Sequence, residues 1–311
     1  MITLIATRLL AGLATLLAAS IIIFATMELL PGDAATQFLG RQASDPAALA
    51  ALREEYGLDR PAVIRYGDWV AGVVRLDFGR SVANGLPVTE LISAPLARTA
   101  ILLVLALLLM FPVAVAIGIV SALRSGTVID ASLQGFTLVM ASLPSFVVGI
   151  ALILAFSFSL KLLPAVSNEL TPAALVLPLA TLVLGWMPLT ARMVRAGVVG
   201  VLQSDYVHMA RLKGLPERRV LRSHVLPNSM VPAIQAFALT AASMPAGIVI
   251  VEYLFAFQGT GSYLIQAVQN RDTYSVEAVT LILVTVYIVA NLIADIATVL
   301  LTPRLRTEAV G

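Results

Sequence analysis

Long apolar runs separated by short polar stretches dominate the chain. A helix needs about 20 apolar residues to cross a hydrocarbon core of about 30 Å, and six stretches meet that length. They are approximately residues 9–30, 99–120, 131–160, 172–191, 229–251 and 276–301. The pattern therefore predicts an all-α, polytopic membrane protein with six transmembrane helices.

Prolines fall inside two of these candidate spans. Pro144 lies in the third, and Pro232 and Pro245 lie in the fifth. Proline removes a backbone donor and clashes with the preceding turn, which membrane helices tolerate when neighbouring groups satisfy the freed carbonyls. We therefore expect kinks or breaks at these positions.

Composition agrees with a membrane protein. Hydrophobic residues make up 59% of the 311 residues and charged residues 12%, whereas soluble domains are about 45–50% apolar. The mean hydropathy is +0.95. The chain has no cysteine, which excludes disulfides and thiolate-held metals or haem. The net charge of +2 says little, because position relative to the spans matters more in a bilayer protein.

Basic residues gather on one side of the six-span arrangement. They are Arg8, Arg124, the cluster from Arg192 to Arg222, Arg304 and Arg306. Because short cytoplasmic loops carry an excess of Lys and Arg, this distribution predicts that both termini are cytoplasmic. The longer segment 31–98 then lies outside, where Tyr56, Tyr66 and Trp69 are suited to short helices on the membrane surface.

The most basic short stretch runs from Ala210 to Asn228. Ahead of it, Ser204 is suited to an N-cap and Asp205 to the first turn of a helix, while Gly214 is suited to its C-terminal stop. Pro216 can then begin a second helix, since its fixed φ suits a first turn. We call residues 204–228 the basic loop, and predict that it holds two short helices joined by a glycine turn.

Three interpretations of the basic loop are open. It can be a solvated segment that fixes topology and attracts anionic lipid, a helix-turn-helix that binds nucleic acid, or a docking element for a cytoplasmic protein. Topology does not require a helix, a glycine stop and a restart. Nucleic-acid binding is disfavoured because no third helix completes a soluble core and both loop ends enter the bilayer. The docking element is therefore our preferred hypothesis.

The amino-acid sequence of the basic loop also resembles that of a known family. DYVHMARLKGLPERRVL, with Gly214 and the later Leu226-Pro227, is similar to the cytoplasmic loop motif of ABC importer permeases, specifically the dipeptide/oligopeptide (peptide/nickel) branch of binding-protein-dependent transport inner membrane components. The motif of that family begins with Glu-Ala-Ala, and the residues at those three positions in this chain are His208, Met209 and Ala210. Other agreeing segments, in order, are LLPGD (29–33), GLDRP (57–61), DFGRS (77–81), VEYLF (251–255), NRD (270–272) and TPRLR (302–306).

The resemblance implies a type I ABC importer permease fold in the bacterial inner membrane. It divides the chain into an N-terminal helix with an extracytoplasmic segment (1–98), a five-helix permease core (99–304) with a coupling loop at about 192–228, and a cytoplasmic tail (305–311). The implied partners are a second, distinct permease subunit, two cytoplasmic ATPase subunits, an extracytoplasmic binding protein and membrane lipid, but no nucleic acid. The implied substrates are di- or oligopeptides, or a related solute such as nickel or glutathione.

The same resemblance implies a subunit that is not an enzyme and binds no cofactor, with ATP and Mg²⁺ held by the partner subunits. The sequence contains no G-x-x-x-x-G-K-S/T phosphate loop. His208 and His224 are the only histidines. Two ligands without cysteine or paired carboxylates make a poor metal site, so we expect no metal.

Candidate site residues fall in two groups. The coupling-loop candidates are Asp205, Ala210, Arg211, Lys213, Gly214, Leu215, Pro216, Arg218, Arg219, Leu226 and Pro227. The cationic side chains among them can contact either an acidic surface of an ATPase or solvent. Glu252, Gly259 and Gly261 are candidates for the substrate path, where Glu252 can meet a peptide amino group or pair with Arg271.

A secondary transporter driven by an ion gradient is the alternative function. Such carriers usually show internal repeats and ionisable residues near the membrane centre. Spans two to five are almost free of charge here, which favours the ATP-driven importer.

Overall fold

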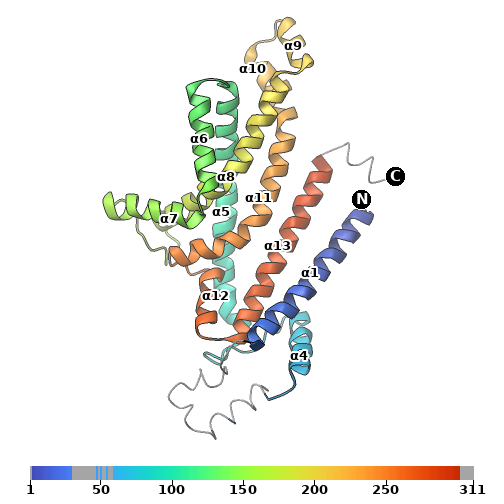
Figure 1. Ribbon diagram of the computed structural model, residues 1–311, viewed down its shortest axis with the longest axis vertical. Coiled ribbons are helices and arrows are strands. Elements are labelled where there is room, and N and C mark those ends of the chain that lie inside the picture. Colours follow the sequence, from blue (N-terminus) through green and yellow to red (C-terminus); the bar gives the residue numbers. More distant parts are fainter. Residues whose placement is uncertain (1, 30–46, 48–49, 51–53, 55–58, 302–311) are drawn as a thin grey trace. The chain divides into compact units, whose positions relative to one another are not determined.

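Figure 1 shows a computed structural model that describes residues 2–29, 47, 50, 54 and 59–301. Within this part the chain is helical, and the only extended pairing is an isolated bridge between Arg80 and Pro87. The all-α prediction is confirmed. The expectations for Tyr56, for most of the LLPGD segment, for TPRLR and for the tail 305–311 lie outside the described residues.

Eleven α-helices are described along the chain. They are α1 (Ile2–Leu29), α4 (Ala62–Val74), α5 (Val88–Leu123), α6 (Val128–Ser142), α7 (Ser145–Leu152), α8 (Pro172–Leu202), α9 (Asp205–Leu212), α10 (Glu217–Val220), α11 (Leu226–Leu254), α12 (Thr260–Gln269) and α13 (Thr273–Leu301). Two π-helical segments, η2 (Ile153–Ser159) and η3 (Leu221–Val225), follow α7 and α10.

Five helical stretches in the described part are long and apolar enough to cross a membrane: Ala6–Leu29, Val88–Leu123, Pro172–Leu202, Glu217–Leu254 and Thr273–Ile296. The predicted third span is instead a pair of helices, Val128–Ser142 and Ser145–Ser159, bent by 109°. Six spans result if this bent pair counts as one.

The prolines behave differently in the two spans. Leu143, just before Pro144, has an extended backbone that ends α6, which is the conformation that proline imposes on its predecessor. The expected break is therefore confirmed at Pro144. By contrast, α11 continues through Pro232 and Pro245 as one helical element, so neither proline breaks the helix, and a kink at these positions stays a prediction.

The chain divides into two compact units. Of the described residues, unit 1 contains 101–257 together with 2–7 of α1 and 287–301 of α13, and unit 2 contains 8–29 of α1, 47, 50, 54, 59–100 and 258–286. Each unit has its own apolar core.

The core of unit 1 lies among α5, α8 and α11. Buried Leu102, Met110, Leu182, Met187 and Ile248 belong to it. Glycines bring the helix backbones close together. A Cβ at Gly118 would lie 2.6 Å from the Ala191 carbonyl oxygen, and one at Gly197 would lie 2.6 Å from the Ser229 carbonyl oxygen. Small residues at such crossings allow tight helix packing in membranes.

Unit 2 gathers the start of α5, α12 and the first turns of α13 around a small core of Val88, Ile92, Ala278 and Val279. Asp272, only 3% exposed, lies at the α12–α13 turn. Its carboxylate accepts hydrogen bonds from the Ser81 hydroxyl, the Val82 amide at 3.0 Å and the Ser275 hydroxyl at 2.7 Å. The DFGRS and NRD segments recognised in the sequence therefore meet in one buried hydrogen-bonded site.

The glycine contact between α8 and α11 leads to a stability prediction. Gly197→Ala should lower the apparent melting temperature, because the added Cβ would overlap the Ser229 carbonyl oxygen and overpacking costs about 1–3 kcal/mol. Gly200→Ala, three residues along the same helix, is the matched control because nothing lies within 4 Å of its Cβ. It should be neutral or slightly stabilising. Thermal unfolding of the purified variants in detergent measures both, and equal destabilisation by the two would contradict the packing argument.

Candidate functional site

The basic loop folds as α9, a glycine turn and α10, and continues through η3 into α11. Ser204 precedes α9 at the predicted N-cap position, with an extended backbone. Its hydroxyl donates to the Val201 carbonyl at 2.6 Å and makes no cap to α9. The start of the helix was therefore predicted correctly, whereas a side-chain cap by Ser204 is absent.

Gly214 ends α9 as predicted, with φ of +75°. Its amide donates to the Arg211 carbonyl at 2.9 Å, and the Leu215 amide donates to the Ala210 carbonyl at 3.3 Å. This pair of bonds is a Schellman motif, which needs a left-handed residue that only glycine adopts without strain. Pro216 then serves as the N-cap of α10, which begins at Glu217, one residue later than predicted.

One side of the loop is anchored in unit 1 by apolar packing. Val207, Val220 and Val225 are fully buried, and Ala210 is 6% exposed. They share one cluster with residues from the ends of α5 and α8 and the start of α11, namely Ala122, Val194, Val198 and Ala233. Figure 1 shows α9 and α10 at the tip of unit 1, beyond the ends of α8 and α11. A force applied to α9 therefore acts directly on these helix ends.

The other side of α9 exposes apolar side chains. Tyr206, Met209 and Leu212 are 46%, 52% and 69% exposed and follow one another at three-residue spacing along the helix. Charged side chains flank them: Asp205, Arg211 and Lys213 are all exposed. Apolar groups rimmed by polar ones are typical of protein interaction sites.

Sequence reasoning missed these three apolar residues because it concentrated on the cations. The helical period would have found them, since it separates Tyr206, Met209 and Leu212 from the buried Val207 and Ala210. Ala210, a predicted coupling residue, supports the loop from inside.

An exposed ion pair connects the two helices on either side of the glycine turn. The Arg211 guanidinium donates to both Glu217 carboxylate oxygens, at 2.6 Å and 3.2 Å, and both side chains are well exposed. The bond to Glu217 raises the pKa of the Arg211 guanidinium above its usual value. Arg211 is thus engaged within the loop.

The remaining candidates of the coupling loop lie on its outer side or at its end. Lys213, Arg218 and Arg219 are exposed, as are Pro216 and Pro227, while Leu215 and Leu226 are half-buried. Their contacts with a partner stay a prediction.

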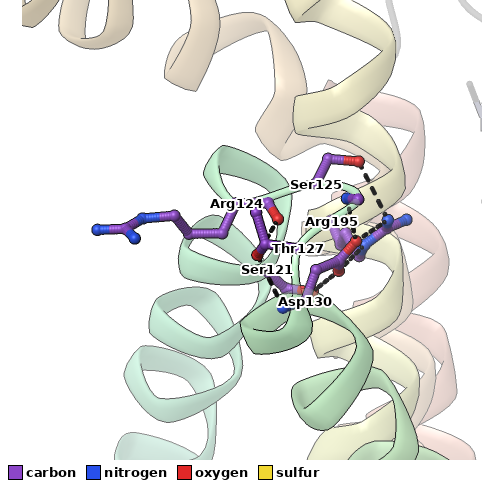
Figure 2. A network of polar contacts seen from close by, with 7 residues as sticks. Ser121, Arg124, Ser125, Thr127, Asp130 and Arg195 are labelled. Carbon is purple, nitrogen blue, oxygen red and sulfur yellow. Dashed lines mark hydrogen bonds and ion pairs between the residues drawn. The ribbon is translucent and has the colours of Figure 1, made fainter.

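A buried ion pair joins the first turn of α6 to α8. Arg195 donates to the two Asp130 carboxylate oxygens at 2.8 Å and 2.7 Å, and Asp130 is only 5% exposed. Figure 2 shows how Ser121, from the end of α5, and the turn between α5 and α6 close around the same carboxylate. The Ser121 hydroxyl donates at 2.6 Å and the Gly126 amide at 3.0 Å.

This network strengthens the same region that anchors the basic loop. Ser121 and Arg195 are sequence neighbours of Ala122 and Val194, which belong to the apolar cluster under α9. Asp130 was not singled out from sequence, and Arg195 was counted only toward topology. The available signal was two opposite charges at the edges of apolar runs, because charges in such places pair with one another.

The predicted substrate-path residues are all buried, but they do not belong to one unit. Glu252, in the last turn of α11, is fully buried in unit 1. Gly259 and Gly261 lie at the start of α12 in unit 2. Their role in a substrate path stays a prediction.

Taken together, the apolar helices and the anchored loop define a polytopic helical membrane protein that presents a short helix at one end of a bundle. Comparison with known proteins specifies the class. Residues 114–307 match the family described as binding-protein-dependent transport system inner membrane component, and residues 1–88 match the N-terminal part of such a component. The chain belongs to this family, and is the permease subunit of an ABC importer.

Relatives match along nearly the whole chain. It is 33% identical over 306 residues to the probable peptide ABC transporter permease protein y4tP of Sinorhizobium fredii, covering 96% of this chain and 97% of the relative. It is 32% identical over 312 residues, with the same coverage, to the oligopeptide transport system permease protein AppB of Bacillus subtilis. A crystal structure of an amino acid ABC transporter with histidines covers 70% of this chain and 95% of its own, with a TM-score of 0.49 at 20% identity.

The buried ion pair leads to a second prediction. Asp130→Asn should lower the apparent melting temperature by several degrees, because it leaves the Arg195 charge without its buried counter-charge. Glu217→Gln is the control, since it changes an ion pair whose side chains are 40% and 56% exposed, and exposed pairs contribute little. Thermal unfolding in detergent measures both variants. A larger loss in Glu217→Gln than in Asp130→Asn would contradict this assignment.

Proposed function

We propose that this chain forms half of the translocation path of an ATP-driven, binding-protein-dependent importer for di- or oligopeptides, and that α9 is its coupling helix. One observation carries the proposal. The exposed apolar side of α9 suits a partner surface, while its opposite side is packed against the ends of α5, α8 and α11.

The names of the relatives support the choice of peptides as substrates. y4tP is named a probable peptide permease and AppB an oligopeptide permease, and each aligns with 96% of this chain.

The proposed assembly contains this chain, a second and distinct permease subunit, two cytoplasmic ATPases and an extracytoplasmic binding protein. Both termini and the basic loop face the cytoplasm of a bacterium, in keeping with the positive-inside rule. The chain catalyses no reaction itself, and ATP with Mg²⁺ binds to the ATPases. The absence of a phosphate-loop motif from the sequence supports this division.

The geometry supports a mechanism of transmission. When ATP closes the ATPase dimer, the ATPase surface displaces α9 through Tyr206, Met209 and Leu212. The Schellman turn at Gly214 and the Arg211–Glu217 pair keep α9 and α10 at a fixed angle. The displacement therefore passes through Val207 and Ala210 to the helix ends and opens the path outward, and hydrolysis resets it.

The test is co-purification of the ATPase from the native host in mild detergent. Gly214→Val should lose most of the ATPase while retaining the second permease, because a β-branched residue strains the left-handed turn that orients α9. Gly85→Val is the matched control. Gly85 also has a positive φ, of +70°, with nothing within 4 Å of an added Cβ, but it lies in unit 2 outside the basic loop. It should retain the ATPase.

A second variant separates backbone strain from surface contact. Met209→Glu leaves the turn intact and places a charge in the exposed apolar row, so it should also lose the ATPase. If both loop variants retain the ATPase, α9 is not the coupling helix. If wild type brings down the second permease but no ATPase, the importer proposal fails and the gradient-driven carrier becomes the better hypothesis.

A further inference from the structure

Helix α8 contains a proline between its contacts with the two apolar clusters of unit 1. Met187 belongs to the core among α5, α8 and α11, whereas Val194 and Val198 belong to the cluster under α9. Pro188 lies inside the helix between these groups. A proline has no N–H to donate to the Leu184 carbonyl, and helices bend sharply at such positions. A force that α9 applies to the end of α8 would therefore bend α8 at Pro188.

Helix α6 packs against α8 and is attached to it on both sides of this proline. After Pro188, Arg195 pairs with Asp130 in the first turn of α6. At its other end α6 leads into α7, which begins at Ser145 and lies against α8 before the proline, since a Cβ at Gly185 would be 3.3 Å from the Ser145 Cβ. The 15 residues of α6 extend about 22 Å, which is longer than the stretch of about 15 Å between Gly185 and Arg195.

The attachment before the proline depends on close packing of α7. Val148 and Gly149 are its buried residues. A Cβ at Gly149 would lie 2.5 Å from Leu254 Cδ2 and 3.3 Å from Thr181 Cγ2. Close approach of this kind fixes α7 to the first part of α8 and to the end of α11.

The attachment after the proline depends on polar groups. The buried side chains of α6 are those of Asp130 and Thr137, and Leu133 and Gln134 are half-buried. In the part of the chain that the structure describes, α6 contributes no side chain to either apolar cluster of unit 1. The two hydrogen bonds between Asp130 and Arg195 are therefore the main contact that sets the position of the start of α6 on α8 (Figure 2).

Stability alone does not explain a buried ion pair at this contact. Replacement of such a pair by apolar residues is often neutral or stabilising, because burial removes both charges from water. A guanidinium that donates two parallel bonds to a carboxylate also fixes direction and distance, which apolar contact does not. The pair therefore suits a contact whose geometry has to persist under an applied force.

We propose that α6 stiffens α8 against bending at Pro188, and that Asp130 and Arg195 are the positioning residues that attach it. A displacement of α9 then reaches the part of α8 before Pro188, and α7 with it, instead of being lost in a bend at the proline. This inference rests on the proposed coupling role of α9. The bending of α8 can nevertheless be measured without the transported solute.

The experiment measures the distance between two spin labels by double electron–electron resonance in the purified transporter with its co-purifying subunits. The labels are attached through Ile150→Cys on α7 and Gly200→Cys near the end of α8. This chain has no cysteine of its own, and any in the other subunits are replaced by serine. Ile150 is exposed, and nothing lies within 4 Å of a Cβ at Gly200. A bend of about 20° at Pro188 would move Gly200 by about 6 Å.

The test variant combines Asp130→Asn with Arg195→Met. It removes the attachment without leaving a buried charge unpaired, and the asparagine keeps an oxygen for the Ser121 hydroxyl. Wild type should give one narrow distance distribution, with or without the non-hydrolysable ATP analogue AMP-PNP. The double variant should give a distribution that is broadened or shifted by several ångströms.

Two proline variants separate stiffening of α8 from a general loss of packing. Pro188→Ala, added to the double variant, should restore the narrow distribution, because alanine supplies the N–H that the helix lacks there. Pro178→Ala is the matched control, since Pro178 also lies inside α8 but outside the stretch from Gly185 to Arg195. It should restore nothing.

Three results would overturn the proposal: a double variant as narrow as wild type, no restoration by Pro188→Ala, or equal restoration by Pro178→Ala. A wild-type distance that changes with AMP-PNP would also overturn it, because α8 would then bend although α6 is attached. If wild type lacks the ATPase, the coupling role of α9 fails instead, and the measurements without nucleotide still test the stiffening.

Discussion

The packing of α9 against the ends of α5, α8 and α11 is the contact on which the proposed coupling depends. An eight-residue helix is too short to be stable alone in water, so α9 exists because Val207 and Ala210 are buried in a cluster with Val194, Val198 and Ala122. The same burial makes α9 mechanically part of the membrane helices. Its stability and its capacity to transmit a force therefore come from one set of contacts, and a substitution that loosens the cluster should weaken both.

An apolar cluster alone would let the helices slide, because the hydrophobic effect has no direction. The Asp130–Arg195 pair supplies direction, since a guanidinium facing a carboxylate with two hydrogen bonds is held at one angle. Ser121 and the Gly126 amide occupy further positions around the same carboxylate. The α5–α6 turn is thereby connected to α8 next to the cluster that holds α9.

The features that could be predicted from the sequence depend on residues close together along the chain. The features that could not be predicted depend on contacts between residues far apart along the chain. The spans follow from apolar length, and the stop at Gly214 follows from its own φ and two nearby amides. Pro144 and Pro232 look alike in sequence, yet only the first ends a helix. Around Pro232, the buried Ser229, Ala233 and Ala236 hold α11 in the core of unit 1, so tertiary packing outweighs the local penalty. Asp130 and Arg195 lie 65 residues apart, and their pairing requires knowing that α6 lies beside α8.

In unit 2, two motifs that lie far apart in the sequence form one hydrogen-bonded site. Asp272 of the NRD segment bonds Ser81 of the DFGRS segment, 191 residues away, and also the Val82 amide and Ser275. The Tyr263 hydroxyl bonds Ser275 at 2.8 Å, and burial raises the pKa of Tyr263. The oxygens of the Asp272 carboxylate, which is 3% exposed, thus accept the hydrogen bonds that hold the α12–α13 turn against the loop before α5. Because a carboxylate engaged in this way has few acceptor positions left, Asp272 serves the fold of unit 2.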